Sequence, residues 1–108
     1  MEKLEHIGIA VKDLAISNRL FAKLLGTEHY KIEQVASEHV NTSFFQVGET
    51  KVELLEATHS DSAIAKFIEK KGEGIHHLAF EVEDIHQAMI RMENQGFTLL
   101  NKEPKRGA

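Results

Sequence analysis

The chain has 108 residues, 42% hydrophobic and 28% charged, which suits one compact domain. Thirteen lysines and arginines against seventeen acidic residues give a formal charge of −4, so no basic field is available for a nucleic acid. Cysteine is absent, which excludes disulfides and thiolate metal ligands. No apolar segment approaches the roughly 20 residues of a membrane span, so we expect a cytoplasmic protein without a membrane partner.

The first part of the chain predicts a strand, a helix and three more strands. Residues 4–11 alternate between apolar side chains and small or polar ones, the period of a strand. A helix can begin at Asp13, with Leu14, Leu20, Phe21, Leu24 and Leu25 mostly on its inward side, and end at Gly26. Three strands are then expected, over residues 29–36, 40–47 and 50–56. Together these elements form a β-α-β-β-β module over residues 4–57.

A connector and a shorter second module follow. The connector, residues 58–74, contains a short helix that the segment Ser60-Asp61-Ser62 can cap. The second module, residues 75–108, is expected to contain a strand over 75–83, a helix over 84–95 with Ile85, Ala88, Met89 and Met92 inward, and a strand over 97–101. By comparison with the first, it lacks its last two strands. The predicted fold is therefore one α+β domain, residues 1–108, whose paired modules form a curled mixed sheet.

An internal repeat relates the two modules. His6 opens the segment His-Ile-Gly-Ile-Ala-Val-Lys-Asp-Leu (6–14), and His77 opens His-Leu-Ala-Phe-Glu-Val-Glu-Asp-Ile (77–85), 71 residues later. A histidine at the same place in each copy suggests one metal site built from both halves, because neutral imidazole is a common ligand for divalent metals. The alternative is that each histidine simply ends a strand in solvent.

Two more residues bear on a metal site. Glu53 is a candidate third ligand, although a carboxylate on the solvated face of a strand is the simpler interpretation. His76 is expected on the strand face opposite His77, as a structural residue or an outer partner of a ligand. The other four histidines have no partner spacing and are expected at the surface.

Four segments carry a resemblance to a known family. They are His-Ile-Gly-Ile-Ala-Val-Lys-Asp-Leu (6–14), Val-Gly-Glu-Thr-Lys-Val-Glu-Leu-Leu-Glu (47–56), the connector running into His-His-Leu-Ala-Phe-Glu-Val (61–82) and Glu-Pro-Lys-Arg-Gly-Ala (103–108). Over nearly its whole length the chain resembles the methylmalonyl-CoA epimerases of the vicinal oxygen chelate (glyoxalase/bleomycin resistance/dioxygenase) superfamily. The third segment is the one specific to the epimerases.

The resemblance implies strands that curl around a divalent ion, cobalt or manganese, with zinc, nickel and magnesium as alternatives. It implies an acyl-CoA thioester substrate and interconversion of (2R)- and (2S)-methylmalonyl-CoA through a metal-stabilised enolate. Residue by residue, it makes His6, Glu53 and His77 metal ligands. The family's fourth ligand, a glutamate on the last strand that is also a candidate base, has no counterpart in this sequence. A second family base falls at Thr42, which leaves nearby Glu38 as a catalytic candidate and the base unassigned.

Three further expectations follow. Another chemistry of the same superfamily, such as a glyoxalase I-like isomerase or lyase, is the alternative enzyme. A non-catalytic module that binds small molecules is the alternative outside enzymes. The shortened second module leaves a sheet edge unpaired, so a homodimer is predicted.

Overall fold

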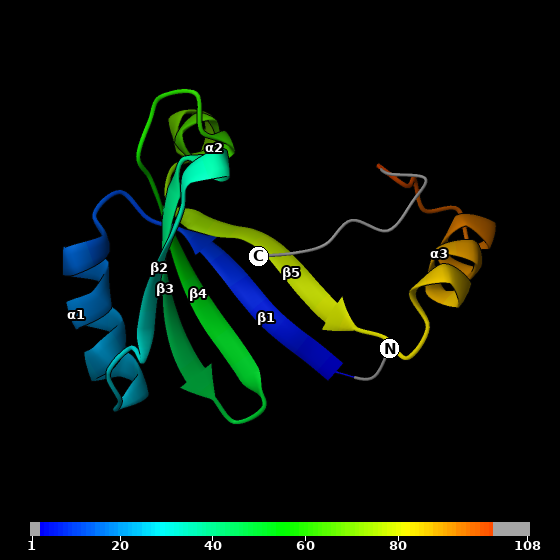
Figure 1. The fold of residues 1–108 in the computed structure, drawn as a ribbon, viewed down its shortest axis with the longest axis horizontal. Helices are drawn as coiled ribbons and strands as arrows, with labels where there is room; N and C mark the ends of the chain where they lie inside the picture. The colour runs from blue at the N-terminus through cyan, green and yellow to red at the C-terminus, as the bar shows by residue number, and fades with distance from the viewer. Residues whose placement is uncertain (1–2, 101–108) are drawn as a thin grey trace.

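The computed structural model describes residues 3–100, which form one five-stranded mixed sheet with three α-helices (Figure 1). In chain order the elements are β1 (Lys3–Ala10), α1 (Leu14–Leu25), β2 (Lys31–Val35), the 3₁₀ turn η1 (Ala36–Glu38), β3 (Val40–Val47), β4 (Thr50–Ala57), α2 (Ala63–Lys71), β5 (Gly74–Glu81) and α3 (Ile85–Asn94). The strand order is β2-β3-β4-β1-β5, with β1 parallel to β4 and antiparallel to β5. The predicted α+β class and curled mixed sheet are confirmed.

The predicted elements lie close to the observed ones, with one exception. The strand expected over residues 97–101 is wrong where it can be tested, because residues 97–100 form no strand. Residue 101 lies outside the described part of the chain. Within residues 3–100, no helix is long and apolar enough to cross a membrane.

Helix α1 covers one face of the sheet. The Asp13 carboxylate caps it by accepting a hydrogen bond from the Ile16 amide at 3.0 Å, and Gly26 ends it in the left-handed conformation at φ 71°. Beneath α1 lies a core cluster whose buried members are Val11, Leu14, Phe45 and Leu54. These contacts join the helix to β3 and β4, so the first module has a continuous core.

Fewer leucines of α1 face the core than predicted. Phe21 and Leu25 pack against the core, but Leu20 and Leu24 are 61% and 71% exposed. The helical period instead carries the inward stripe through two buried polar residues, Ser17 and Asn18. The expectation that Leu20 and Leu24 face the core was therefore wrong.

Helix α2 packs on the opposite face of the sheet, near one end. The Ser62 hydroxyl caps it by accepting a hydrogen bond from the Ile64 amide at 3.1 Å. Ile64 is buried with Ala10 and Leu55, and Phe67 packs against this second cluster. The two clusters therefore lie on opposite faces of the central strands.

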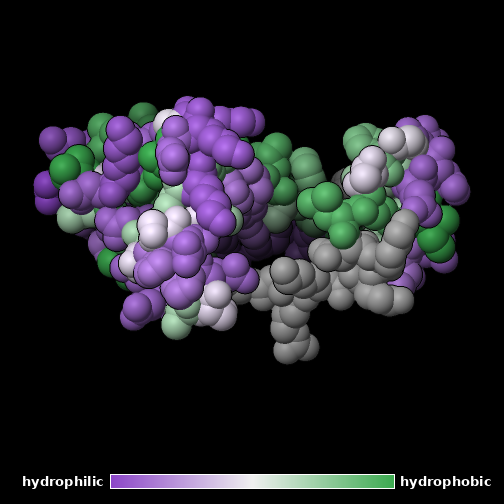
Figure 2. Space-filling model, turned by 90° about the horizontal axis from the view of Figure 1, so that it is seen from above, coloured by the Kyte–Doolittle hydropathy of each residue, from purple (hydrophilic) through white to green (hydrophobic). Residues whose placement is uncertain are grey.

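Helix α3 stands apart from the sheet, beyond the end of β5 (Figure 1). None of its residues is buried, and Ile85 is 47% exposed, so the predicted inward packing of this helix was wrong. Viewed from above, hydrophobic surface lies on both sides of the hollow between α3 and the rest of the molecule (Figure 2). The physical reason is that β3 and β4 place Phe45 and Leu54 under α1, whereas residues 97–100 supply no strand under α3.

Candidate metal centre

Three strands meet at Gly8, and they bring the predicted ligands to one face of the sheet. Gly8 is the register partner of Glu53 on the parallel strand β4 and of His77 on the antiparallel strand β5. His6 lies two residues before Gly8, so its side chain leaves the same face. This is the face opposite α1, because Ile9 and Val11, at the alternate positions, pack under that helix.

The absence of a side chain at Gly8 makes room for the ring of His77. A Cβ atom at Gly8 would lie only 2.2 Å from Cε1 of His77 and 2.6 Å from both ring nitrogens. Real Cβ atoms do not approach so closely, so any larger residue would displace the imidazole. Gly8 is therefore part of the site through the space that it leaves.

His6 occupies the middle of the cluster. Its Nε2 atom lies 3.0 Å from Nε2 of His77, with the two rings edge to face at 89°. Its Nδ1 atom donates to Oε1 of Glu5 at 2.7 Å and lies 3.4 Å from Oε2 of Glu53. The structure thus joins all three predicted ligands, with His77 on one side of the His6 ring and Glu53 on the other.

Two β-bulges in the β1–β5 ladder bring His76 and Glu5 to this cluster, and the sequence had not pointed to Glu5. The register shifts between Leu4 and His6, which leaves Glu5 as the extra residue on β1. It shifts again where Gly8 pairs with His77 and Ile9 with Ile75, which leaves His76 as the extra residue on β5. Neither extra residue is itself a glycine or a proline, and the glycine that borders the second bulge, Gly8, lies on the other strand, so strand alternation alone did not locate them.

The bulge on β5 corrects the prediction for His76. Its Nδ1 atom lies 3.0 Å from Nδ1 of His77, and its ring meets Phe67 of α2 edge to face, with 5.0 Å between centroids. His76 therefore lies beside His77 and not on the opposite face. The expectation of an outer partner for a ligand agrees with this contact.

The side chains present suit a divalent cation. The Nε2 atoms of His6 and His77 lie 3.0 Å apart. Two neighbouring ligand atoms of one octahedral ion, at bond lengths of about 2.0–2.1 Å, are also roughly 3 Å apart. Among the described residues, the histidine and acidic groups whose ligand atoms all lie within 4.8 Å of one another are Glu5, His6 and Glu53. His77 contacts this group at His6, through the two Nε2 atoms. Imidazole and carboxylate together suit cobalt, manganese, zinc and related ions.

The Glu53 carboxylate faces Nδ1 of His6 and not the pair of Nε2 atoms. For His6, His77 and Glu53 to share one ion, the Glu53 side chain has to rotate toward the Nε2 side. The donors fit a cation chemically, and this rotation is the rearrangement that the predicted ligand set requires.

Burial and neighbouring charges tune the ionisable groups. Burial raises the pKa of Glu53, against the lowering effect of His6. The pKa of Glu5 is lowered by its hydrogen bond from His6 and then by Lys51, whose ammonium lies 3.0 Å away. Burial, followed by His6 and His76, lowers the pKa of His77 and favours the neutral imidazole that a metal needs.

The two remaining catalytic candidates lie elsewhere. Glu38 is exposed in η1, which links β2 to β3, and β4 separates these strands from β1. Thr42 is buried on β3 opposite Leu55, the partner of Ala10, and so belongs to the face that carries His6. A carboxylate at position 42 would face the site, but threonine cannot serve as a base there.

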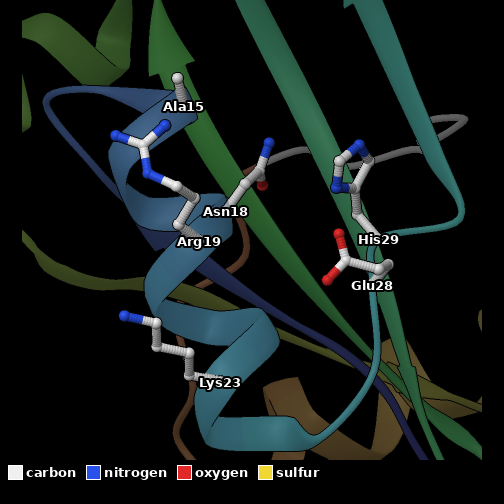
Figure 3. A pocket seen from close by; sticks show the side chains of 6 residues that line it. All are labelled: Ala15, Asn18, Arg19, Lys23, Glu28 and His29. Carbon is white, nitrogen blue, oxygen red and sulfur yellow. The ribbon is translucent and has the colours of Figure 1, made fainter.

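A pocket of about 430 Å³ lies beside α1, on the face of the sheet away from His6 (Figure 3). Its lining consists of Ala15, Asn18, Arg19, Lys23, Glu28 and His29. None of the predicted ligands contributes to it. The pocket is therefore separate from the metal centre.

Comparison with known proteins shows the family and the fold of the chain. The family model described as Glyoxalase/Bleomycin resistance protein/Dioxygenase superfamily matches residues 5–108. The chain is 38% identical to an ethylmalonyl-CoA/methylmalonyl-CoA epimerase of Cereibacter sphaeroides, over 98% of this chain and 81% of that one. It is similar in structure to a Streptomyces coelicolor methylmalonyl-CoA epimerase variant in complex with 2-nitronate-propionyl-CoA. That match has a TM-score of 0.87 and 31% identity, and covers all of this chain and 79% of that one.

The mammalian relatives are longer. The chain is 35% identical to the bovine mitochondrial methylmalonyl-CoA epimerase over 98% of its own length, but it spans 61% of that enzyme. The shared part includes both modules and every predicted ligand.

Proposed function

Because the chain belongs to the glyoxalase/bleomycin resistance protein/dioxygenase superfamily, we propose that it is a metal-dependent epimerase that interconverts (2R)- and (2S)-methylmalonyl-CoA. Relatives and structural neighbours named as methylmalonyl-CoA epimerases support the substrate. The observation that carries the proposal is the meeting of His6, Glu53 and His77 around Gly8. No nucleophile or organic cofactor is needed for this chemistry.

His6, Glu53 and His77 are the residues that we assign to hold the ion, with cobalt or manganese as the first candidates. A bound divalent ion supplies positive charge next to the thioester and carboxylate oxygens of the substrate, which is worth several kcal/mol when an enolate forms. The lowered pKa of His77 favours its neutral ring, the form that can bind a metal. Gly8 keeps the space above the strand open for that ring.

Epimerisation requires removal of the α-proton and its return to the other face of the same carbon. A positioned carboxylate is the usual carrier for such a proton. Glu5 and Glu53 are the carboxylates beside His6, and Glu38 lies in η1 at the far side of the sheet. We assign none of them as the base.

We also infer the assembly and the domain plan. One domain comprises the modules 4–57 and 75–108 and the connector 58–74. Strand β5 ends the sheet, and within residues 3–100 its outer edge has no strand partner. An open edge is a template for pairing, so we propose a homodimer. Light scattering checks this, and a monomer at micromolar concentration would refute it.

The function is tested by following exchange of the α-proton. The protein, with and without cobalt, is incubated with methylmalonyl-CoA in heavy water, and deuterium at the α-carbon is followed by mass spectrometry. Cobalt-dependent uptake is expected, with loss in a His77→Ala variant and retention in the matched control His86→Ala, a residue exposed on α3. Ethylmalonyl-CoA in a parallel reaction measures the acyl selectivity.

Two results would overturn the proposal. Uptake that is the same with a chelator present would remove the metal from the chemistry. No uptake by a protein that demonstrably binds cobalt would favour another reaction of the superfamily or a binding role.

A further inference from the structure

Each histidine that we assign as a ligand is preceded by a bulged residue that contacts its Nδ1 atom. Glu5 accepts a hydrogen bond from Nδ1 of His6 at 2.7 Å, and Nδ1 of His76 lies 3.0 Å from Nδ1 of His77. Without the two bulges, the residue before each histidine would leave the opposite face of its strand. The bulges thus give each ring an outer partner.

We propose that Glu5 and His76 are positioning residues that set the tautomers of His6 and His77, and that His76 and His77 exchange tautomers together when an ion binds. This inference rests on the proposed metal site. Partners of this kind fix the orientation and the protonated nitrogen of a metal-binding histidine, and their loss typically costs 10–100-fold in affinity. A carboxylate or a carbonyl is the usual partner, whereas here His77 has a third imidazole.

The hydrogen bonds define one arrangement of protons when the three rings are neutral. Glu5 can only accept, so His6 carries its proton on Nδ1 and its Nε2 atom is free of one. His77 then donates from Nε2 to that atom, which leaves its own Nδ1 without a proton. His76 in turn donates from Nδ1 to Nδ1 of His77.

Ion binding changes two of the three rings. His6 already offers a bare Nε2 and needs no change. His77 can offer Nε2 only if its proton moves to Nδ1, and a proton on that atom needs an acceptor. His76 becomes this acceptor when its own proton moves from Nδ1 to Nε2. Each ring keeps one proton, so the exchange releases none.

The core holds His76 in place for this role. Its ring meets Phe67 edge to face, with an interplanar angle of 83°, and Phe67 packs against the cluster around Ala10 and Leu55. Helix α2 therefore supports the third imidazole directly. Such support limits the rotation that would otherwise separate His76 from His77.

The other arrangement that the donors allow is distinct. An ion on the Nδ1 side of His6 would be bound by Glu5 and Glu53, and His77 would take no part. In that case Glu5 is a ligand, His6 carries its proton on Nε2, and His76 has no effect on affinity. The two arrangements differ at His6, which carries its proton on Nδ1 in the first and on Nε2 in the second.

The experiment reads tautomers directly. Long-range ¹H–¹⁵N spectra of ¹⁵N-labelled protein, recorded at pH 8 after chelation and again with one equivalent of zinc, report the protonated nitrogen of each ring. We expect Nε2–H on His77 and Nδ1–H on His76 without zinc, and the reverse with zinc. His6 should carry Nδ1–H in both. Unchanged tautomers of His76 and His77 in zinc-saturated protein, or a His6 proton on Nε2, would overturn the inference.

Paired variants measure the effect on affinity. His76→Phe keeps an aromatic ring against Phe67 and removes the acceptor, so the Kd for zinc should rise roughly 10–100-fold. His76→Asn offers an amide oxygen near the place of Nδ1 and should recover most of the loss. His86→Phe makes the same change on exposed α3 and should leave the Kd unchanged. Equal affinities for His76→Phe and the original protein would contradict the role of His76.

Glu5 is tested in the same way. Glu5→Ala should weaken zinc binding by the same order, whereas Glu5→Gln keeps an oxygen that can accept from Nδ1 of His6 and should recover part of it. Glu49→Ala, in the exposed turn between β3 and β4, is the matched control. Loss in Glu5→Gln as large as in Glu5→Ala, with the His6 proton on Nε2 in the zinc-bound protein, would make Glu5 a ligand. Neither the tautomer spectra nor the Kd for zinc depends on catalysis. Absence of epimerase activity would therefore refute the proposed function without refuting this inference.

Discussion

The two copies of the repeat begin alike and end in different surroundings. In the first, α1 lies over β3 and β4, and Phe45 and Leu54 are completely buried beneath it. In the second, Leu78 and Phe80 of β5 are each 51% exposed, and α3 lies apart from the sheet (Figure 1). The contrast shows that an amphipathic helix becomes part of a core only where neighbouring strands supply its partners.

The largest expected difference between the copies concerns leucine truncation. Leu54→Ala removes a fully buried side chain and should lower the free energy of unfolding by about 2–5 kcal/mol. Leu78→Ala makes the same chemical change at a half-exposed position and should cost less than about 1 kcal/mol. Urea titrations followed by far-ultraviolet circular dichroism measure both. Equal losses would show that the second copy is packed in solution.

The glycine of the repeat should matter in one copy only. Gly8→Ala forces the His77 ring out of its place, so the Kd for cobalt should rise about tenfold or more. This rise corresponds to a loss of at least about 1.4 kcal/mol of binding free energy. Ala79→Gly, at the equivalent position of the second copy, should change the Kd by less than about threefold. Cobalt absorption titrations provide the comparison. Unaltered affinity in Gly8→Ala would mean that His77 does not bind the ion from the position described.

Equivalent helix caps give a smaller contrast. Asp13 accepts from the Ile16 amide at 3.0 Å, and Asp84 accepts from the Gln87 amide at 3.1 Å. Asp13→Ala should lower global stability by about 0.5–2 kcal/mol, because α1 unfolds with the core. Asp84→Ala should speed amide exchange within α3 and leave the urea midpoint unchanged. A shift of the midpoint in Asp84→Ala would show that α3 is coupled to the rest.

The smallest effect is a dependence on pH that belongs to the packed copy. Burial raises the pKa of Glu53 in the folded protein, so its contribution to stability is present below its ordinary pKa and is lost as pH rises through the raised value. In the presence of a chelator, Glu53→Gln should therefore be more stable than the original protein at pH 7, with the advantage shrinking as pH falls. Exposed Glu49→Gln should show no such trend in the same titrations. An advantage that grows toward low pH would have the wrong sign.

Periodicity and end signals were sufficient for most of the fold. Asp13 and Gly26 marked the ends of α1, and the predicted span of β3 was matched residue for residue. The repeat and the resemblance together selected His6, Glu53 and His77, which the structure brings together. Glu53 and His77 both pair with Gly8, and His6 lies two residues before Gly8 on β1, so the pleat of the sheet places all three on one face.

What the sequence could not supply was register. Bulges at Glu5 and His76 depend on how β1 and β5 pair, and Gly8, which borders the second bulge, does not by itself locate the extra residue. The inward stripe of α1 passes through Ser17 and Asn18, which polarity alone assigns to the surface. The position of α3 depends on whether strands lie beneath it, and the hydrophobic pattern of the helix itself carries no information about those strands.

The central claim is that the repeat builds one metal site from both copies. Equilibrium dialysis against cobalt, with metal analysis of the protein, tests it most directly. We expect one ion per chain, with at least a hundredfold weaker binding in both His6→Ala and His77→Ala and unchanged binding in His86→Ala. If His77→Ala instead binds one ion per chain as tightly as the original protein does, the site is not shared, because the first copy would then be sufficient for it.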